Sequence, residues 1–172
     1  MPSAPQRQSG DLETTVALLR DSRRRILLCG GRFTHLLAQY LGLHLMQMRD
    51  AVQILPDRDV ERTAVLSGLN RRDVLVVFDY RRYEPDNLAL AQLAAERGGK
   101  AVVFTDTWLS PVSAHADVVL PSRAASTSPY DSFVPTLAVI ETVVAHVIAA
   151  LGPAARDHLQ QTEATARRAG LV

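Results

Sequence analysis

The sequence predicts an α/β protein built as a three-layer α/β/α sandwich around a sheet of about five parallel strands. Short apolar runs alternate along the chain with helical segments of roughly 10 to 15 residues, which is the pattern of strands joined by crossover helices. The run 73–78 (DVLVVF) shows no polar alternation, as expected of a strand that is buried on both faces. A chain of 172 residues is long enough for one domain with a substantial core.

The expected elements follow one another in a regular order. The strands are expected at 26–30, 52–55, 73–78, 100–105 and 116–121, and the helices at 11–21, 33–46, 59–69, 89–97, 133–151 and 154–169. The second helix has apolar residues at i, i+3 and i+4 spacing, which indicates one buried face. Pro56 ends the second strand, and Gly98 with Gly99 ends the fourth helix.

Composition narrows the class of protein. The single cysteine, Cys29, excludes an intramolecular disulfide and a cysteine-based metal cluster, and the cytoplasm is the expected location. The first ten residues, MPSAPQRQSG, lack the apolar core of a secretory signal and are expected to form a disordered tail before a domain that spans 11–172. No apolar run comes near the roughly 18 residues of a membrane span, so no membrane partner is expected.

Charge does not favour a nucleic-acid binder, because the formal net charge is only +1. Lys100 is the one lysine among 19 basic residues, and the arginines occur in pairs and triplets. We interpret these groups as solvated ends of helices and strands. They lie at 23–25, 71–72, 81–82 and 167–168.

The ligand site of a parallel sheet lies outside the carboxyl ends of its strands, which here points to the loops 30–35, 79–84, 105–110 and 121–132. In the first loop, Gly31 would let the backbone approach a ligand, and Arg32 and Thr34 would supply donors for phosphate or carboxylate. The alternative is a plain strand-to-helix turn in which Thr34 caps the helix.

The second loop departs from a simple anion site. Asp79 would repel a phosphate unless Arg81 or Arg82 neutralises it, and Tyr83 follows directly. The alternative is an ion pair between Asp79 and one of the two arginines that fixes the turn.

The remaining two loops offer hydroxyl groups. Ser110 before Pro111 is typical of a helix cap with proline at the first helical position. Thr105 and, in the fourth loop, Ser126 and Ser128 are candidate ligands for a sugar or phosphate, with a plain loop as the alternative.

Catalysis has little support in the sequence. His35 lies near the predicted pocket but has no carboxylate partner placed by the sequence, and no paired-acid pattern involves Asp79 or Glu84. The chain shows no nucleophile elbow, no metal-ligand spacing and no cofactor motif. We therefore expect a protein that is not an enzyme.

Four stretches resemble SIS (sugar isomerase) domains, two of them in the form found in one group of regulators. FTDTWLSPVSAHADVVLP, 104–121, resembles the family segment in which a strand ends in Thr-Asp and Ser-Pro starts a short helix. CGGRFTHLLAQYLGLHL, 29–45, is similar to the first strand and the G-x-G-x-S loop. The stretch DVLVVFDYRRY with the following GGKAVVFTD, and YDSF before the long helix, resemble RpiR/MurR-type bacterial transcription regulators.

The resemblance implies a flavodoxin-like SIS fold that binds a sugar phosphate and forms a homodimer or a dimer of dimers. In regulators of this type the domain is the effector module, and the helix 11–21 would end the linker from a helix-turn-helix domain. Contact with DNA is expected only through such a domain, which lies outside these residues. The family's S-x-S-G-x-T phosphate loop falls on 79–84, where its serines, glycine and threonine are replaced.

Three hypotheses follow. In the first, a non-catalytic sensor holds an anion with Arg32, Arg81 and helix N-termini, while Thr34, Ser126 and Ser128 contact the sugar. In the second, the chain is a phosphosugar isomerase with His35 or Glu84 as the base. In the third, it is a degenerate SIS domain that only dimerises, and Asp79 pairs with Arg81 or Arg82 across a closed pocket.

Overall fold

The computed structural model describes the backbone from Ala4 to Val172 and the side chains from Gly10 onward. Helices and strands alternate as expected. They are α1 (Ala4–Arg20), β1 (Arg25–Gly30), α2 (His35–Met48), β2 (Val52–Ile54), α3 (Asp59–Ser67), β3 (Asp73–Asp79), α4 (Pro85–Glu96), β4 (Lys100–Thr105), the short 3-10 helix η1 (Pro111–His115), β5 (Val118–Pro121), α5 (Val134–Leu151) and α6 (Pro153–Arg168).

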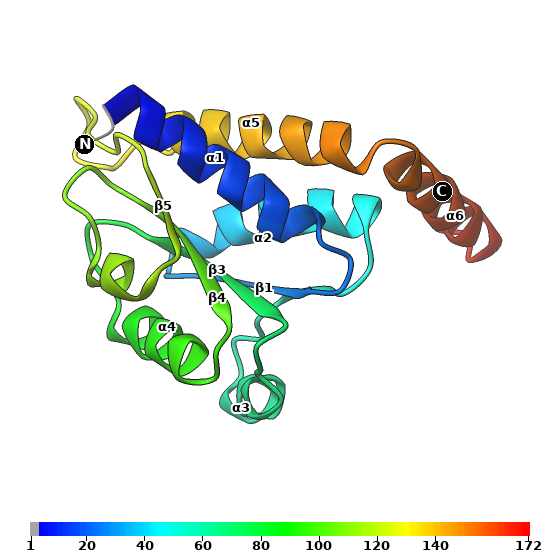
Figure 1. Cartoon of the computed structure of the whole chain (residues 1–172), viewed down its shortest axis with the longest axis horizontal. Coiled ribbons are helices and arrows are strands. Elements are labelled where there is room, and N and C mark those ends of the chain that lie inside the picture. The colour runs from blue at the N-terminus through cyan, green and yellow to red at the C-terminus, as the bar shows by residue number, and fades with distance from the viewer. Residues whose placement is uncertain (1–3) are drawn as a thin grey trace.

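The five strands form one parallel sheet in the order β2-β1-β3-β4-β5. The helices α1, α2 and α5 cover one face of this sheet, while α3, α4 and η1 lie on the other (Figure 1). The predicted three-layer α/β/α architecture is therefore confirmed. The last helix, α6, extends away from the body of the domain (Figure 1).

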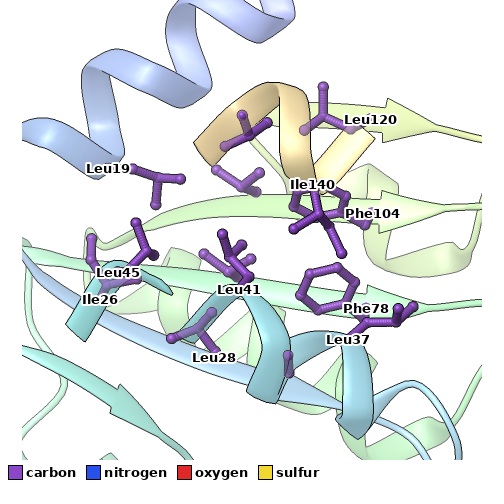
Figure 2. Packing of buried hydrophobic residues seen from close by; sticks show 14 of the residues in the cluster. Leu19, Ile26, Leu28, Leu37, Leu41, Leu45, Phe78, Phe104, Leu120 and Ile140 are labelled. Carbon is purple, nitrogen blue, oxygen red and sulfur yellow. The ribbon is translucent and has the colours of Figure 1, made fainter. Parts of the chain in front are cut away.

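The core consists of two apolar clusters, one on each face of the sheet. Every residue of β3 is buried, as its uniform apolar run predicted. On the face covered by α2 and α5, Phe78 stacks on Phe104 with ring centroids 4.5 Å apart, and Leu41 and Ile140 pack around this pair (Figure 2). On the other face, burial raises the pKa of the Cys29 thiol to about 12, so the thiol stays protonated.

Helix α1 begins earlier than expected. Residues 4–10, which were expected to belong to a disordered tail, form its first turns, and residues 1–3 lie outside the described part of the chain. Pro5 falls in the first turn, where a missing backbone N–H costs nothing, and no proline follows it within the helix. A polar segment without hydrophobic periodicity can therefore extend a helix that is anchored further along, here by buried Leu19.

Helix α5 departs from the expectation that no apolar segment approaches the length of a membrane span. By length and composition it could cross a membrane, since its 18 residues have a mean hydropathy of 2.0. Its buried residues Ile140, Val143 and Val147 pack into the core, which accounts for one apolar face. Only 28% of the helix is buried, however, so much of its apolar surface is exposed on the domain.

Candidate functional site

A small pocket of about 50 Å³ lies at the carboxyl ends of β1 and β3, where the sequence placed the ligand site. Its lining contains Gly31, Arg32, Phe33, Thr34, Asp79, Tyr80, Arg82, Glu84, Asp131 and Phe133. Five of the predicted site residues therefore come together here. The other five, Arg81, Tyr83, Thr105, Ser126 and Ser128, are not part of the lining.

The β1 loop is fixed by the hydroxyl of Thr34. This hydroxyl accepts a hydrogen bond from the backbone N–H of Gly31 at 2.7 Å and donates one to the carbonyl of Phe78 at 2.7 Å. It makes no cap hydrogen bond to α2, so the expected capping role is wrong. Gly30 is required because a Cβ there would lie 2.6 Å from the Thr34 backbone. The Thr34 hydroxyl thus connects the end of β1 to the end of β3 through two hydrogen bonds.

The carboxylate of Glu84 occupies the position where an anion would meet the β1 loop. Its Oε1 accepts a hydrogen bond from the backbone N–H of Arg32 at 2.9 Å. A Cβ added at Gly31 would clash with the same carboxylate, so Gly31 is needed for this close approach. Glu84 therefore accepts a hydrogen bond from a backbone N–H of the loop that the sequence predicted would bind an anion.

Asp79 is buried and holds the start of α4. Its carboxylate accepts hydrogen bonds from the backbone N–H of Glu84 at 3.1 Å, from Asn87 Nδ2 at 2.9 Å and from the Ser110 hydroxyl. Among the described residues it makes no ion pair, so the expected pairing of Asp79 with Arg81 or Arg82 is wrong. Arg81 instead turns away from Asp79 to meet Asp131.

Asp106, at the end of β4, holds the loop 79–84 closed. It accepts hydrogen bonds from the backbone N–H groups of Arg81 (2.8 Å) and Trp108 (2.9 Å), and from the Tyr83 hydroxyl (2.7 Å). Burial, together with this bond to Asp106, raises the pKa of Tyr83 to about 12, so the phenol stays a donor. Arg81 and Tyr83 adopt positive φ values of 33° and 41°.

Two contacts connect the loop 79–84 to the start of α5. The guanidinium of Arg81 lies 2.9 Å from a carboxylate oxygen of Asp131, a contact of opposite charges without the alignment of a hydrogen bond. Buried Tyr80 shares hydrogen bonds with Ser122 and Thr136, both at 3.0 Å, and burial raises the pKa of its phenol. Thr136 lies in α5, so a movement of this loop would reach that helix.

Arg81 also lies against Trp108, with its guanidinium carbon 5.3 Å from the ring centroid. Trp108 is 72% exposed and is not among the residues that line the pocket, so its contact is with Arg81.

The remaining predicted hydroxyls serve the loops that carry them. Ser110 caps η1 by accepting a hydrogen bond from Val112 at 3.1 Å, as its Ser-Pro sequence predicted, and Thr105 accepts one from the N–H of Ser110 at 3.0 Å. Ser126 and Ser128 are exposed and accept hydrogen bonds from N–H groups two residues further on, both at 3.1 Å.

His35, the histidine considered as a base, has no carboxylate partner among the described residues that would activate it. Nδ1 of His35 lies 2.9 Å from the Arg32 carbonyl, and no carboxylate in the described chain lies within ion-pair distance of His35. Within the described residues, no group of three histidine, cysteine or acidic side chains could hold a metal ion. Two arginines and three acids line the pocket, which gives the lining a net negative charge.

Sequence reasoning did not assign the structural roles of three acids that shape this site. Glu84 was considered only as a base, and Asp106 and Asp131 were not assigned to the site. A usable signal existed for Asp106, because it falls in the loop 105–110, which the rule for parallel sheets places at the same end of the sheet as Asp79.

The five-stranded parallel sheet with helices on both faces places the chain in the α/β class. The family model of the SIS domain matches residues 18–146, so the chain belongs to the SIS domain family. None of the curated proteins compared with the chain matches it.

Solved structures show the same fold. The sugar isomerase domain of an RpiR transcription factor from Sphaerobacter thermophilus is 25% identical, with a TM-score of 0.83 over 92% of this chain and 88% of that one. The Vibrio vulnificus NanR protein, solved in complex with ManNAc-6P, is 17% identical, with a TM-score of 0.71 over 95% of this chain and 67% of that one. A third structure is that of a hypothetical protein from Methanococcus jannaschii, from which a molecular function of 3-hexulose-6-phosphate isomerase was inferred. It is 13% identical, with a TM-score of 0.69 over 89% of this chain and 84% of that one.

Proposed function

We propose that this chain is the regulatory SIS module of an RpiR-type transcription factor, and that it senses an anionic sugar such as a sugar phosphate without converting it. The observation that carries the proposal is the Glu84 carboxylate on the backbone N–H of Arg32. With Glu84 in place the pocket measures about 50 Å³, whereas small-molecule sites are usually about 300–1,000 Å³. A ligand can enter only if the loop moves, and such coupling is what a sensor requires.

The contacts around the loop give this movement a route to α5. An incoming phosphate would compete with Glu84 for the Arg32 N–H and with Asp131 for the Arg81 guanidinium. Release of Asp131 would free the segment directly before α5. The ligand would thus bias two arrangements of one connected unit, because it binds the open arrangement better.

The exposed surface of α5 supports pairing with a second copy of the chain. Val134 is 71% exposed and Ile148 is 47% exposed on this apolar helix. Beside it lies an apolar cleft of about 320 Å³ between α1, β5 and α5, lined by Leu12, Val119, Leu120, Pro121, Ala138, Val139 and Thr142. An exposed apolar surface of this kind is typical of a protein interface. A change at the pocket would therefore alter how two subunits are arranged.

Substitution of Ala138 by arginine tests the pairing. We expect the unsubstituted chain to have the molar mass of a dimer in light scattering, and Ala138→Arg to be monomeric, because a long charged side chain would enter the apolar cleft. Ala164→Arg, on the exposed surface of α6, is the matched control and should remain dimeric. A monomeric parent chain, or a dimeric Ala138→Arg variant, would exclude this surface.

Substitution of Glu84 by glutamine tests the ligand site. Removing the carboxylate charge should increase the affinity for sugar phosphates about tenfold or more in calorimetry, equivalent to about 1.4 kcal/mol, since the anion no longer competes with it. Glu96→Gln removes the same charge at an exposed position of α4 and should leave the affinity unchanged.

Three other outcomes would separate the alternatives. If neither the parent chain nor Glu84→Gln binds any sugar phosphate or sugar acid, the module only dimerises. If Glu84→Gln binds these anions more weakly, Glu84 is a ligand and does not close the site. If the purified protein converts a phosphosugar and Glu84→Gln or His35→Ala abolishes the conversion, the chain is an isomerase.

A further inference from the structure

A second concave surface lies at the amino ends of the strands, opposite the carboxyl ends that carry the candidate site. It is lined by Arg23, Arg24, Arg71, Arg72 and Asp21, encloses about 500 Å³, and is called here the arginine cleft. Its residues precede β1 and β3, at the amino ends of these strands. The sequence suggested only solvated ends of elements, whereas the fold brings two separate arginine groups together.

The backbone around the arginine cleft is firmly held. Arg24 reaches across it, with Nη1 3.4 Å from the carbonyl oxygen of Arg71. On the β3 side, Asn70 orders the turn by accepting a hydrogen bond from the N–H of Arg72 at 3.0 Å and by donating its own N–H to Asp73 at 2.8 Å. The two arginine groups are therefore presented from a fixed turn on each side.

Positive charge in the arginine cleft exceeds what the protein neutralises. Asp21 is its one carboxylate, and Arg23 binds it with contacts of 3.0 and 3.1 Å while Arg24 lies 3.5 Å away. The hydrogen bond from Arg23 lowers the pKa of Asp21 to about 2, so Asp21 is ionised at neutral pH. In the described structure, Arg71 and Arg72 make no ion pair. Four guanidinium groups thus face one carboxylate.

Two other arginines of the same sheet edge serve the protein itself. Arg25 pairs with buried Asp73, at 2.9 and 2.8 Å, and buried Arg49 donates to backbone carbonyls. Their partners lie within the fold, whereas the side chains of Arg71 and Arg72 are exposed. Arg71 and Arg72 therefore contribute positive charge to the arginine cleft that no carboxylate of the described chain pairs with.

We propose that the arginine cleft binds a small polyanion that carries two or more phosphate groups. Guanidinium groups bind phosphate through paired N–H donors, and several arginines on a fixed frame suit a chain of phosphates. A volume of about 500 Å³ lies in the range of small-molecule sites. Nucleic acid fits less well, because the cleft is local and the whole chain has a net charge of only +1.

Calorimetry with inorganic tripolyphosphate and with a nucleoside triphosphate tests the proposal on the whole chain. Both should bind, and equal affinities would assign the recognition to the phosphate chain alone. Binding should weaken as salt is raised, because exposed charges are screened. The double variant Arg71→Ala/Arg72→Ala should lose about tenfold or more in affinity, as expected when charge-assisted contacts are removed.

The matched control is Arg167→Ala/Arg168→Ala, which removes the same charge from exposed positions at the end of α6 and should bind like the parent chain. The proposal fails if the parent chain does not bind tripolyphosphate, or if both double variants lose affinity equally. Binding of duplex DNA that excludes tripolyphosphate would reassign the cleft to nucleic acid.

Discussion

Substitution of Asp79 by alanine should lower the free energy of unfolding by about 3 kcal/mol. The buried carboxylate accepts three hydrogen bonds, and its removal leaves Asn87, Ser110 and the backbone N–H of Glu84 without an acceptor. Hydrogen bonds to a charged group contribute about 1.5–3 kcal/mol each, and a buried group left unsatisfied costs about 1–3 kcal/mol. Urea unfolding followed by circular dichroism measures the loss.

Asp86→Ala is the matched control for this experiment. Asp86 lies in the first turn of the same helix, α4, and is exposed, so its removal should cost less than about 1 kcal/mol through the helix dipole alone. Similar losses for the two variants would show that Asp79 does not organise the loop and the helix start. A large loss confined to Asp79→Ala would establish that this acid has a structural role at the carboxyl end of β3.

Substitution of Arg49 by alanine should cost about 3–4 kcal/mol. Arg49 is buried and donates to the carbonyls of Leu19, Asp21 and Arg24, and its Nε donates to the carbonyl of Asp50 at 3.0 Å. The last carbonyls of a helix have no partner within the helix. Without Arg49, the Leu19 carbonyl loses its donor, so the end of α1 should fray more easily. Urea unfolding and amide hydrogen exchange in residues 15–20 measure both effects.

Two variants frame the Arg49 result. Arg49→Lys keeps the charge but provides a single donor point, so it should recover only part of the stability. Arg58→Ala removes an exposed arginine before α3 and should change the free energy of unfolding by less than about 0.5 kcal/mol. If hydrogen exchange at the end of α1 is unchanged in Arg49→Ala, Arg49 does not anchor that helix.

The elements and their order were predictable because their signals are local. The apolar run of β3, the i, i+3, i+4 pattern of α2 and the glycines at 98 and 99 each act within a few residues. The position of the pocket was predictable as well, since it follows from the carboxyl ends of parallel strands. Helix boundaries were less accurate, because α1 and α4 both begin at a Pro-containing first turn that has no hydrophobic periodicity.

The partners within the site could not be predicted from charge alone. The sequence suggested that Arg81 neutralises its neighbour Asp79, but the loop conformation turns the two side chains apart, and Asp131 is separated from Arg81 by 50 positions in the chain. The same holds for Glu84, whose acceptor role depends on the close approach of Gly31. Such pairings depend on backbone dihedrals and on strand register, which residue types do not reveal.

The left-handed backbone of the loop has a consequence for the proposed sensor. Non-glycine residues resist such dihedrals, so Arg81 and Tyr83 each raise the free energy of the closed loop by about 1–3 kcal/mol. The hydrogen bonds to Asp106 hold the loop in this conformation. Because the closed loop is raised in free energy, opening it costs less than it would without the two positive φ values. The ligand concentration at which the proposed sensor responds would therefore depend on Asp106 and Tyr83 as well as on the residues that contact the ligand.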